Sequence, residues 1–325
     1  MLKRFECWFF VAGIFMLLGT GPLLGQQDGE ALSGSAGLET QSPRYQGKSL
    51  SGRDLIAAEP SSSLLEQYRQ AKQRLEADPG NADLEIWLGR FTAYQGLHRQ
   101  AIQIYTNGLK RHPDDPRFLR HRGHRHISLR DFDSAIADLR RAVELIEGKA
   151  DPIEPDGMPN PRNQPVSSLH TNIWYHLGLS YYLKNDLPNA VASYERGLAA
   201  SKNDDMRVAF THWLYMGYRQ MGQHKKAEQR LEIISDQMNV IESFDYHQLC
   251  LFYKGNLTLE EIEKRKPAES KGSSDALRYG IANWYLYSGN EERSRQLMEE
   301  ISNSQTWSSF GCLAAEATLQ RNLGH

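Results

Sequence analysis

The chain has 325 residues, of which 40% are hydrophobic and 24% are charged, so it can bury a substantial core. Its formal net charge at pH 7 is −2. Because nucleic-acid-binding proteins carry a strongly basic face, this balance excludes a bulk electrostatic attraction to nucleic acid. Charge that serves binding must therefore be local.

The first residues predict export from a bacterial cell. Lys3 and Arg4 precede an apolar run of signal-peptide length, Cys7 to Leu18, and small residues follow it. We expect a signal peptide over residues 1–25, cleaved after Gly25, and hence a periplasmic or secreted protein with no membrane span. The alternative is an uncleaved anchor, although the run is short for a bilayer span of about 20 residues.

Two segments of different character follow. Residues 26–60 are rich in Gly, Ser and Gln with few apolar side chains, and such a segment cannot bury enough surface to offset the entropy of ordering. We expect a disordered linker there. Helical periodicity begins at Ser62. One apolar stripe continues from that point through Leu64, Leu65, Tyr68, Ala71 and Leu75.

A period of 34 residues runs through the rest of the chain. It separates Gly89 from Gly123, and Ala101 from Ala135. The clearest unit reads Trp174-x2-Leu177-Gly178-x2-Tyr181, followed by Ala190-x3-Tyr194. This pattern resembles the tetratricopeptide repeat, a pair of antiparallel helices. Small residues of the pattern permit the helices to approach closely, and aromatic side chains fill the space beside them.

The resemblance implies an all-α fold over residues 61–325. We expect a right-handed α-solenoid of about six helix-turn-helix repeats, with a capping helix near residues 306–319. The block from Arg120 to Lys184 also resembles uncharacterised exported bacterial tetratricopeptide proteins. In a stack whose units contact only their neighbours, Cys250 and Cys312 lie too far apart for a disulfide. Both are expected to be buried free thiols.

An insertion interrupts the period between the second and third repeats. Residues 148–166 read GKADPIEPDGMPNPRNQPV, and their five prolines exclude a helix. Insertions in repeat proteins often lie on the binding face. We predict an ordered strap on the first helices of the second and third repeats, anchored by the apolar side chains of Ile153, Met158 and Val166. The alternative is a loose surface loop.

The resemblance also implies that the first helix of each repeat lines a concave groove, chiefly through its second, fifth, sixth, ninth and thirteenth residues. Carried onto this sequence, the register predicts a basic and aromatic groove that binds a protein or peptide segment, an acidic one being a candidate. Its predicted ligand-binding residues are Arg90, Tyr94, Arg117, Arg120, His121, His124, Asn172, Tyr175, His176 and His212.

Three interpretations of the basic cluster in the second repeat stay open. It loosely resembles the carboxylate-clamp subclass, with Arg and His where Lys and Asn are usual, and would then grip a ligand's carboxylate through charge-assisted hydrogen bonds. Alternatively, its charges pair with nearby acids on a solvated surface. In the third interpretation, acids of the insertion dock on it and make the insertion an internal ligand or a gate. The nearby acids are Asp131, Asp133 and Asp138, and those of the insertion are Asp151, Glu154 and Asp156.

The sequence offers no positive sign of catalysis. It contains neither a GxSxG nucleophile motif nor a glycine-rich phosphate loop, so we predict no catalytic residues and no cofactor. The histidines of the groove lack the spacing of known zinc motifs, and no metal site is predicted. The leading interpretation is a non-catalytic exported scaffold.

The alternative function is an envelope carbohydrate-binding protein or enzyme that uses the same groove. Aromatic side chains would then stack on sugar faces, so their exposure distinguishes the two functions. The candidates are Trp174, which the motif predicts to be buried, and Tyr175, Tyr182 and Trp213.

Overall fold

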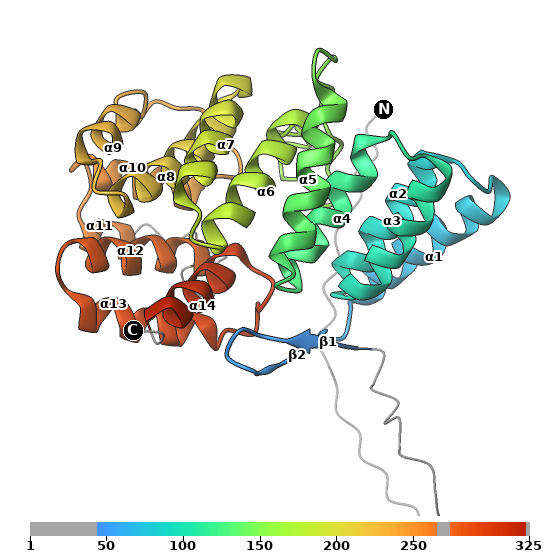
Figure 1. The fold of residues 1–325 in the computed structure, drawn as a ribbon, viewed down its shortest axis with the longest axis horizontal. Helices are drawn as coiled ribbons and strands as arrows, with labels where there is room; N and C mark the ends of the chain where they lie inside the picture. Colours follow the sequence, from blue (N-terminus) through green and yellow to red (C-terminus); the bar gives the residue numbers. More distant parts are fainter. Residues whose placement is uncertain (1–43, 265–273, 323–325) are drawn as a thin grey trace, which may run out of the picture. The chain divides into compact units, whose positions relative to one another are not determined.

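The computed structural model describes residues 44–264 and 274–322. In this part of the chain, a two-stranded hairpin precedes helix α1 (Ser62–Ala77), and helix pairs then follow one another along the sequence up to helix α14 (Phe310–Asn322) (Figure 1). The pairs are α2 (Ala82–Tyr94) with α3 (His98–Arg111), α4 (Pro116–Ser128) with α5 (Phe132–Ile146), α6 (Leu169–Leu183) with α7 (Leu187–Ala200), α8 (Asp204–Gln220) with α9 (His224–Leu231), α10 (Phe244–Tyr253) with α11 (Leu259–Lys264), and α12 (Asp275–Tyr287) with α13 (Glu291–Ser302). The predicted all-α solenoid of about six repeats with a capping helix is confirmed.

Small residues bring the two helices of a repeat together. A Cβ at Gly89 of α2 would collide with the ring of Tyr105 in α3, and a Cβ at Gly178 of α6 would lie 2.5 Å from the ring of Tyr194 in α7. Both tyrosine rings are fully buried. The absence of a side chain on the first helix therefore makes room for the aromatic side chain of the second.

The turn inside each helix pair requires a positive φ at one position. Glycine meets this need at Gly96 and Gly222, with φ of 76° and 69°. In the second repeat the residue is Arg130, with φ of 65°. This conformation costs a residue with a Cβ roughly 1–2 kcal/mol, and the contacts of the Arg130 side chain can offset that cost.

The Arg130 side chain joins the second repeat to the C-terminal helix. Its Nε lies 3.0 Å from Oε2 of Glu316 in α14, and its Nη2 lies 2.7 Å from Oε1. The exposed fractions of the two side chains are 3% and 1%. Nη2 of Arg130 also donates to the carbonyl oxygen of Trp307 at 2.9 Å. This buried pair holds the last helix against a repeat 186 residues earlier in the chain.

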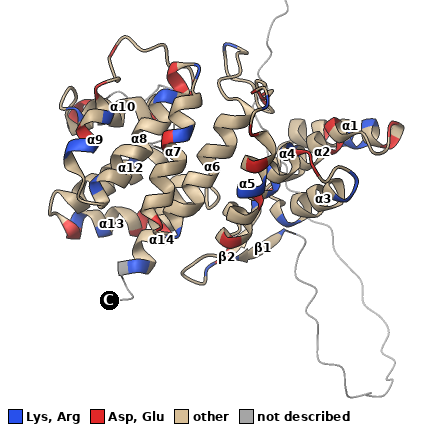
Figure 2. Ribbon diagram, turned by 45° about the horizontal axis from the view of Figure 1, so that its top comes forward, with Lys and Arg blue, Asp and Glu red and all other residues tan. Residues whose placement is uncertain are grey.

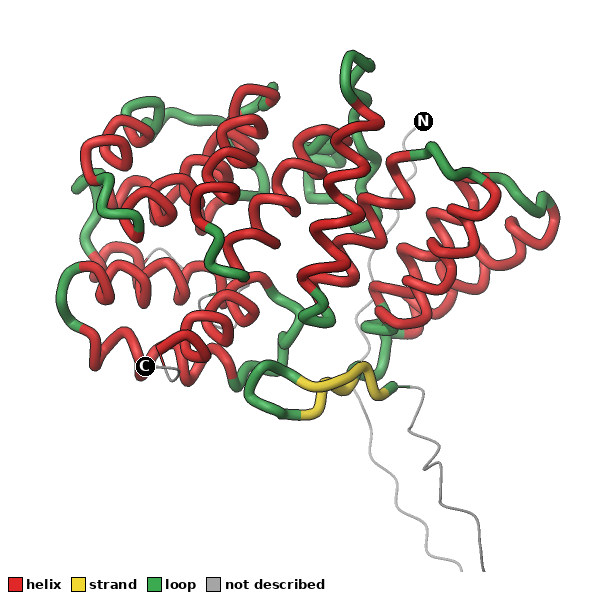
Figure 3. The backbone as a smooth tube through the Cα atoms, viewed as in Figure 1, coloured by secondary structure: helices red, strands yellow, loops and turns green. Residues whose placement is uncertain are grey.

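The N-terminal hairpin contacts the segment that precedes α14. Strands β1 (Tyr45–Lys48) and β2 (Asp54–Ile56) pair antiparallel (Figure 3). The indole N–H of Trp307 donates to the carbonyl oxygen of Ile56 at 2.9 Å, and Nη1 of Arg53 donates to the carbonyl oxygen of Ser304 at 3.1 Å. Residues at the two ends of the described chain are therefore bonded to each other.

The expectation of a disordered linker up to residue 60 is wrong for residues 44–60. Leu55 and Ala57 are buried there, and Arg53 bonds to a partner about 250 residues away. The average composition of residues 26–60 does not reveal these buried residues, because they belong to a short apolar run near the C-terminal end of the segment. The expected signal peptide and residues 26–43 lie outside the described residues.

Two further expectations concern single side chains and helices. Cys250 and Cys312 are both free and buried, which confirms the assignment from the repeat spacing. Along residues 44–264 and 274–322, none of the helices is both long and apolar enough to span a membrane.

Replacing Glu316 with alanine tests the closure. The substitution leaves the Arg130 guanidinium buried without its carboxylate, and the loss of one partner of a buried pair costs about 3–5 kcal/mol. We expect the free energy of unfolding, measured by urea denaturation, to fall by that amount. Glu300→Ala is the control, because the Arg278–Glu300 pair lies at the surface, where a pair contributes about 0–1 kcal/mol. Equal losses in both variants would contradict a special role for Glu316.

Candidate functional site

The predicted groove residues separate into groups with different surroundings. They come from the first helices α2, α4, α6 and α8, as the register requires. Seven of the ten are buried, whereas Tyr94, Arg117 and His124 are partly exposed. The buried ones are Arg90, Arg120, His121, Asn172, Tyr175, His176 and His212.

The Glu154 carboxylate of the insertion contacts one group of these residues, Arg120, His121 and Asn172. Oε1 of Glu154 lies 3.0 Å from Nη2 of Arg120 and 3.6 Å from Nε2 of His121. Asn172 donates its side-chain N–H to Oε2 of Glu154 at 3.0 Å. The side chains of Arg120 and Glu154 are 10% and 11% exposed. In this group, Glu154 holds the position that the third interpretation gives to an internal ligand.

The insertion is held by polar contacts along its length. Nη2 of Arg90 donates to the carbonyl oxygen of Pro155 at 2.8 Å. The side-chain amide of Asn203 donates to the carbonyl oxygen of Val166 at 2.6 Å. At its base, Asp151 pairs with Lys202 at 3.2 Å. A Cβ at Gly157 would collide with the Tyr94 hydroxyl, so a side chain at this position would have to displace the Tyr94 ring.

The expected apolar anchors of the insertion are wrong in two cases of three. Ile153 is 52% exposed and Met158 is 73% exposed, and only Val166 is buried. The physical reason is the polarity of the surface beneath. Arginine and asparagine side chains of α2, α4 and α6 require acceptors, and the carbonyl oxygens and the Glu154 carboxylate of the insertion supply them.

Other cations of the second repeat pair with acids of the repeats. Nη2 of Arg117 lies 2.6 Å from Asp115, and Nη1 contacts Asp83. Arg122 forms a two-pronged pair with Asp138 at 2.6 and 2.7 Å. Figure 2 shows both signs of charge around α4 and α5. For these residues the second interpretation, pairing within the repeats, describes the contacts.

The C-terminal helix covers the histidines of the groove. The ring of Phe310, at the start of α14, lies 5.3 Å from that of His124, 5.8 Å from that of Tyr175 and 5.6 Å from that of His176. The His124 and His176 rings are 4.2 Å apart. His212 is stacked 4.6 Å from Tyr246. This part of the predicted groove is filled by the chain itself.

Desolvation keeps these histidines neutral. It acts on His124 as well, because Nδ1 of that ring is buried although the residue as a whole is partly exposed. It lowers the pKa of His121, His124 and His176 well below 6.5, and the neighbouring cations Arg120 and Arg125 lower it further. Burial lowers the pKa of His212 to about 3. At neutral pH the cationic partners for an anion in this region are therefore the arginines alone.

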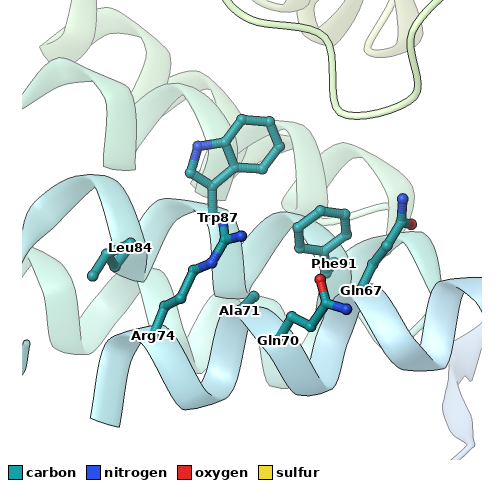
Figure 4. Close-up of a pocket in the computed structure, with 7 residues that line it drawn as sticks. All are labelled: Gln67, Gln70, Ala71, Arg74, Leu84, Trp87 and Phe91. Atoms are coloured by element: carbon teal, nitrogen blue, oxygen red, sulfur yellow. The ribbon is translucent and has the colours of Figure 1, made fainter. Parts of the chain in front are cut away.

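Two open spaces lie near the N-terminal repeats, and residues of α2 line both. The insert opening, about 220 Å³, lies between α2, α4 and the insertion. It is lined by Asp83, Ile86, Trp87, Arg90, Arg117, His121, Pro152, Ile153, Glu154, Pro155 and Leu169. The α1–α2 cleft, about 260 Å³, is lined by Gln67, Gln70, Ala71, Arg74, Leu84, Trp87 and Phe91 (Figure 4). Trp87 lies on the wall of both spaces.

Trp87 is held in place by its neighbours on α2. The Phe91 ring stacks 5.5 Å from it, and the Arg90 guanidinium lies 4.3 Å above its ring centre. A tryptophan fixed in this way presents an apolar face without losing much side-chain freedom on binding. The two spaces therefore share one rigid aromatic wall.

The prediction from sequence missed Ile86 and Trp87. They occupy the fifth and sixth places of α2, the same register positions that give Arg120 and His121 in α4. The register predicts both positions, but an apolar and an aromatic side chain did not match the basic character that was expected of the groove.

Three of the four aromatic side chains of the carbohydrate alternative are not available to a sugar. Tyr175, Tyr182 and Trp213 are buried. Trp174 is only partly buried, contrary to expectation, and the Arg196 guanidinium lies 6.0 Å above its ring. In the described parts of the chain, no three His, Cys, Asp or Glu side chains converge as metal ligands would.

Comparison with known proteins identifies the repeats. Two models of the tetratricopeptide repeat match residues 92–152 and 171–204. The chain contains tetratricopeptide repeats. The matches leave out residues 153–170, so the greater part of the insertion lies outside the family pattern.

Solved structures resemble the tetratricopeptide-repeat chain at low sequence identity. MamA is 20% identical over 50% of this chain and 81% of its own, with a TM-score of 0.39. YrrB, described as a TPR protein with an unusual peptide-binding site, is 12% identical over 74% of this chain and 96% of its own, with a TM-score of 0.40. No curated protein sequence matches the chain.

The buried histidines predict a loss of stability in acid. In the unfolded chain a histidine takes up a proton near pH 6.5, whereas His121, His124, His176 and His212 resist it in the folded state. Their contribution is therefore complete above pH 6.5 and is lost as pH falls below it. For each histidine that stays neutral, we expect the unfolding constant to rise up to about tenfold per pH unit.

Urea denaturation at pH 7.5, 6.5 and 5.5 measures this effect. His212→Phe removes one buried histidine and should flatten the dependence, whereas His224→Gln, at an exposed position of α9, should leave it unchanged. A free energy of unfolding that is constant from pH 7.5 to 5.5 would show that the buried histidines do not oppose protonation.

Proposed function

We propose that this protein is a non-catalytic, exported scaffold that binds an extended protein or peptide segment across Trp87. The observation that carries the proposal is that Trp87 forms a wall of both the insert opening and the α1–α2 cleft. A segment that crosses the Trp87 ring would place side chains in both spaces. Trp and Arg are the residues most often found at the energetic centres of protein interfaces, and Arg90 lies directly on this ring.

The lining of the two spaces suits a peptide with mixed side chains. Ile86, Leu169 and the exposed Ile153 offer apolar contacts in the insert opening. In the α1–α2 cleft, Gln67 and Gln70 carry amide groups that can both donate and accept hydrogen bonds. Peptide main chain requires both kinds of partner, so the cleft is suited to an extended backbone.

The absence of catalysis is supported by the chemistry of the same lining. As the described residues form it, the wall of the insert opening has no Ser, Thr, Cys or Lys nucleophile. Export is supported by the basic and apolar pattern of residues 3–18.

Binding to an array of immobilised peptides tests the scaffold function. The array should consist of twelve-residue peptides in which acidic, aliphatic and aromatic positions are varied independently, and the probe is the full chain. We expect Trp87→Ala to weaken binding of the retained peptides at least about tenfold, which corresponds to 1.4 kcal/mol. Affinities are then measured in solution by fluorescence anisotropy.

Trp174→Ala is the matched control for this experiment. Trp174 is also a partly buried tryptophan near an arginine, and it lies on α6 outside both spaces. Circular dichroism establishes that each variant is folded. The proposal fails if no peptide is retained, or if both tryptophan variants lose binding equally.

A further inference from the structure

We infer that Glu154 is a built-in occupant of a carboxylate site, and that a carboxylate of the bound segment takes its place. The inference rests on the proposed function and adds to it the ligand chemistry and a means of control. The insertion would act as a gate, closed by Glu154 and opened by an acidic ligand.

The first argument is the geometry around Glu154. Its carboxylate receives the Arg120 guanidinium on one oxygen and the Asn172 amide on the other, both at 3.0 Å. Arginine and asparagine are suited to a carboxylate because both present N–H donors in a plane. These donors belong to the rigid helices α4 and α6, whereas the acceptor belongs to the insertion. The repeats therefore form the site, and the insertion fills it.

The second argument is that the site has unused capacity for an anion. Nη2 of Arg120 lies 3.0 Å from Glu154 and Nη1 lies 2.8 Å from Nδ1 of His121, whereas the buried Nε has no hydrogen-bond partner among the described residues. Arg90 and Arg125 lie close enough to Arg120 to interact with it electrostatically. Burial lowers the pKa of Arg125 to about 10, with Arg120 and Arg90 contributing. Of these three arginines, Arg120 alone has a carboxylate within 4.0 Å in the described structure.

The third argument is access. Glu154 and Pro155 form part of the wall of the insert opening, where the proposed segment binds. The neighbouring Ile153 and Met158 are exposed, so lifting this part of the insertion uncovers little apolar surface. The base of the insertion stays fixed, because Leu169 donates to the carbonyl oxygen of Pro152 and Lys202 holds Asp151.

These contacts make release depend on the ligand. A buried guanidinium without an anion is strongly unfavourable, so Glu154 leaves readily only when another carboxylate replaces it. A neutral segment has to bind beside the closed insertion. An acidic segment can exchange with Glu154 and keep Arg120 paired throughout.

Acetate tests the carboxylate site without any peptide. Glu154→Ala removes the atoms that acetate contains, so 100 mM acetate should fill the space and raise the Tm of this variant by about 2–4 °C. The same concentration of acetamide, which has no charge, should have no effect on it. Wild-type protein and Glu154→Ala/Arg120→Leu should not respond to acetate. An equal response of wild type and Glu154→Ala would overturn the inference.

Peptide affinity tests the exchange. Glu154→Gln keeps the size of the side chain and removes its charge, so it also serves if Glu154→Ala does not fold. We expect it to bind acidic array peptides about tenfold more tightly than wild type, with neutral peptides of the same length unchanged. Asp151→Asn is the control, since it loosens the base of the insertion but leaves Arg120 paired with Glu154.

The two readouts separate the inference from the proposed function. If acetate stabilises Glu154→Ala but no variant binds a peptide, the carboxylate site stands and the scaffold function at Trp87 is refuted. If peptides bind through Trp87 but Glu154→Gln does not change their affinity, the exchange is overturned and the scaffold function stands.

Discussion

Two largely buried arginines of the second repeat pair with carboxylates from distant segments, and these pairs place the parts of the chain outside the regular repeats. The second repeat contributes Arg120 and Arg130, both largely removed from water. An unpaired charge there would cost far more than a surface pair contributes. Glu154 of the insertion and Glu316 of the last helix provide the two carboxylates. The insertion and α14 thus return to the same repeat for the same electrostatic reason.

The repeats themselves could be predicted because their packing is local. Gly89 and Tyr105 lie within one helix pair, as do Gly178 and Tyr194, so a 34-residue period is enough to locate them. The return of α14 could not be predicted in this way. Its partner Arg130 is 186 residues away, and the sequence offers many acids that could pair with it. The hairpin was missed for the same reason, since Arg53 and Ile56 are ordered by residues near the other end of the chain.

The sequence predicts which helix positions face the candidate site, but it does not predict which of them are exposed. The repeat pattern places His124, Tyr175 and His176 on one face, but nothing in it shows that Phe310 covers that face. The same register places Trp87 on α2, and there the neighbouring α1 leaves a cleft. Exposure is decided by what packs against a helix, and this depends on contacts between distant segments.

The polar character of the insertion follows from what lies beneath it. An apolar strap would bury arginines without acceptors, which is unfavourable, whereas carbonyl oxygens and one carboxylate satisfy them. Because the contacts beneath the insertion are polar, Ile153 stays exposed at the rim of the insert opening. A segment that binds there meets apolar surface at the rim and arginine further in. The requirement that stabilises the closed insertion therefore also selects a ligand that can meet it, one that carries its own carboxylate.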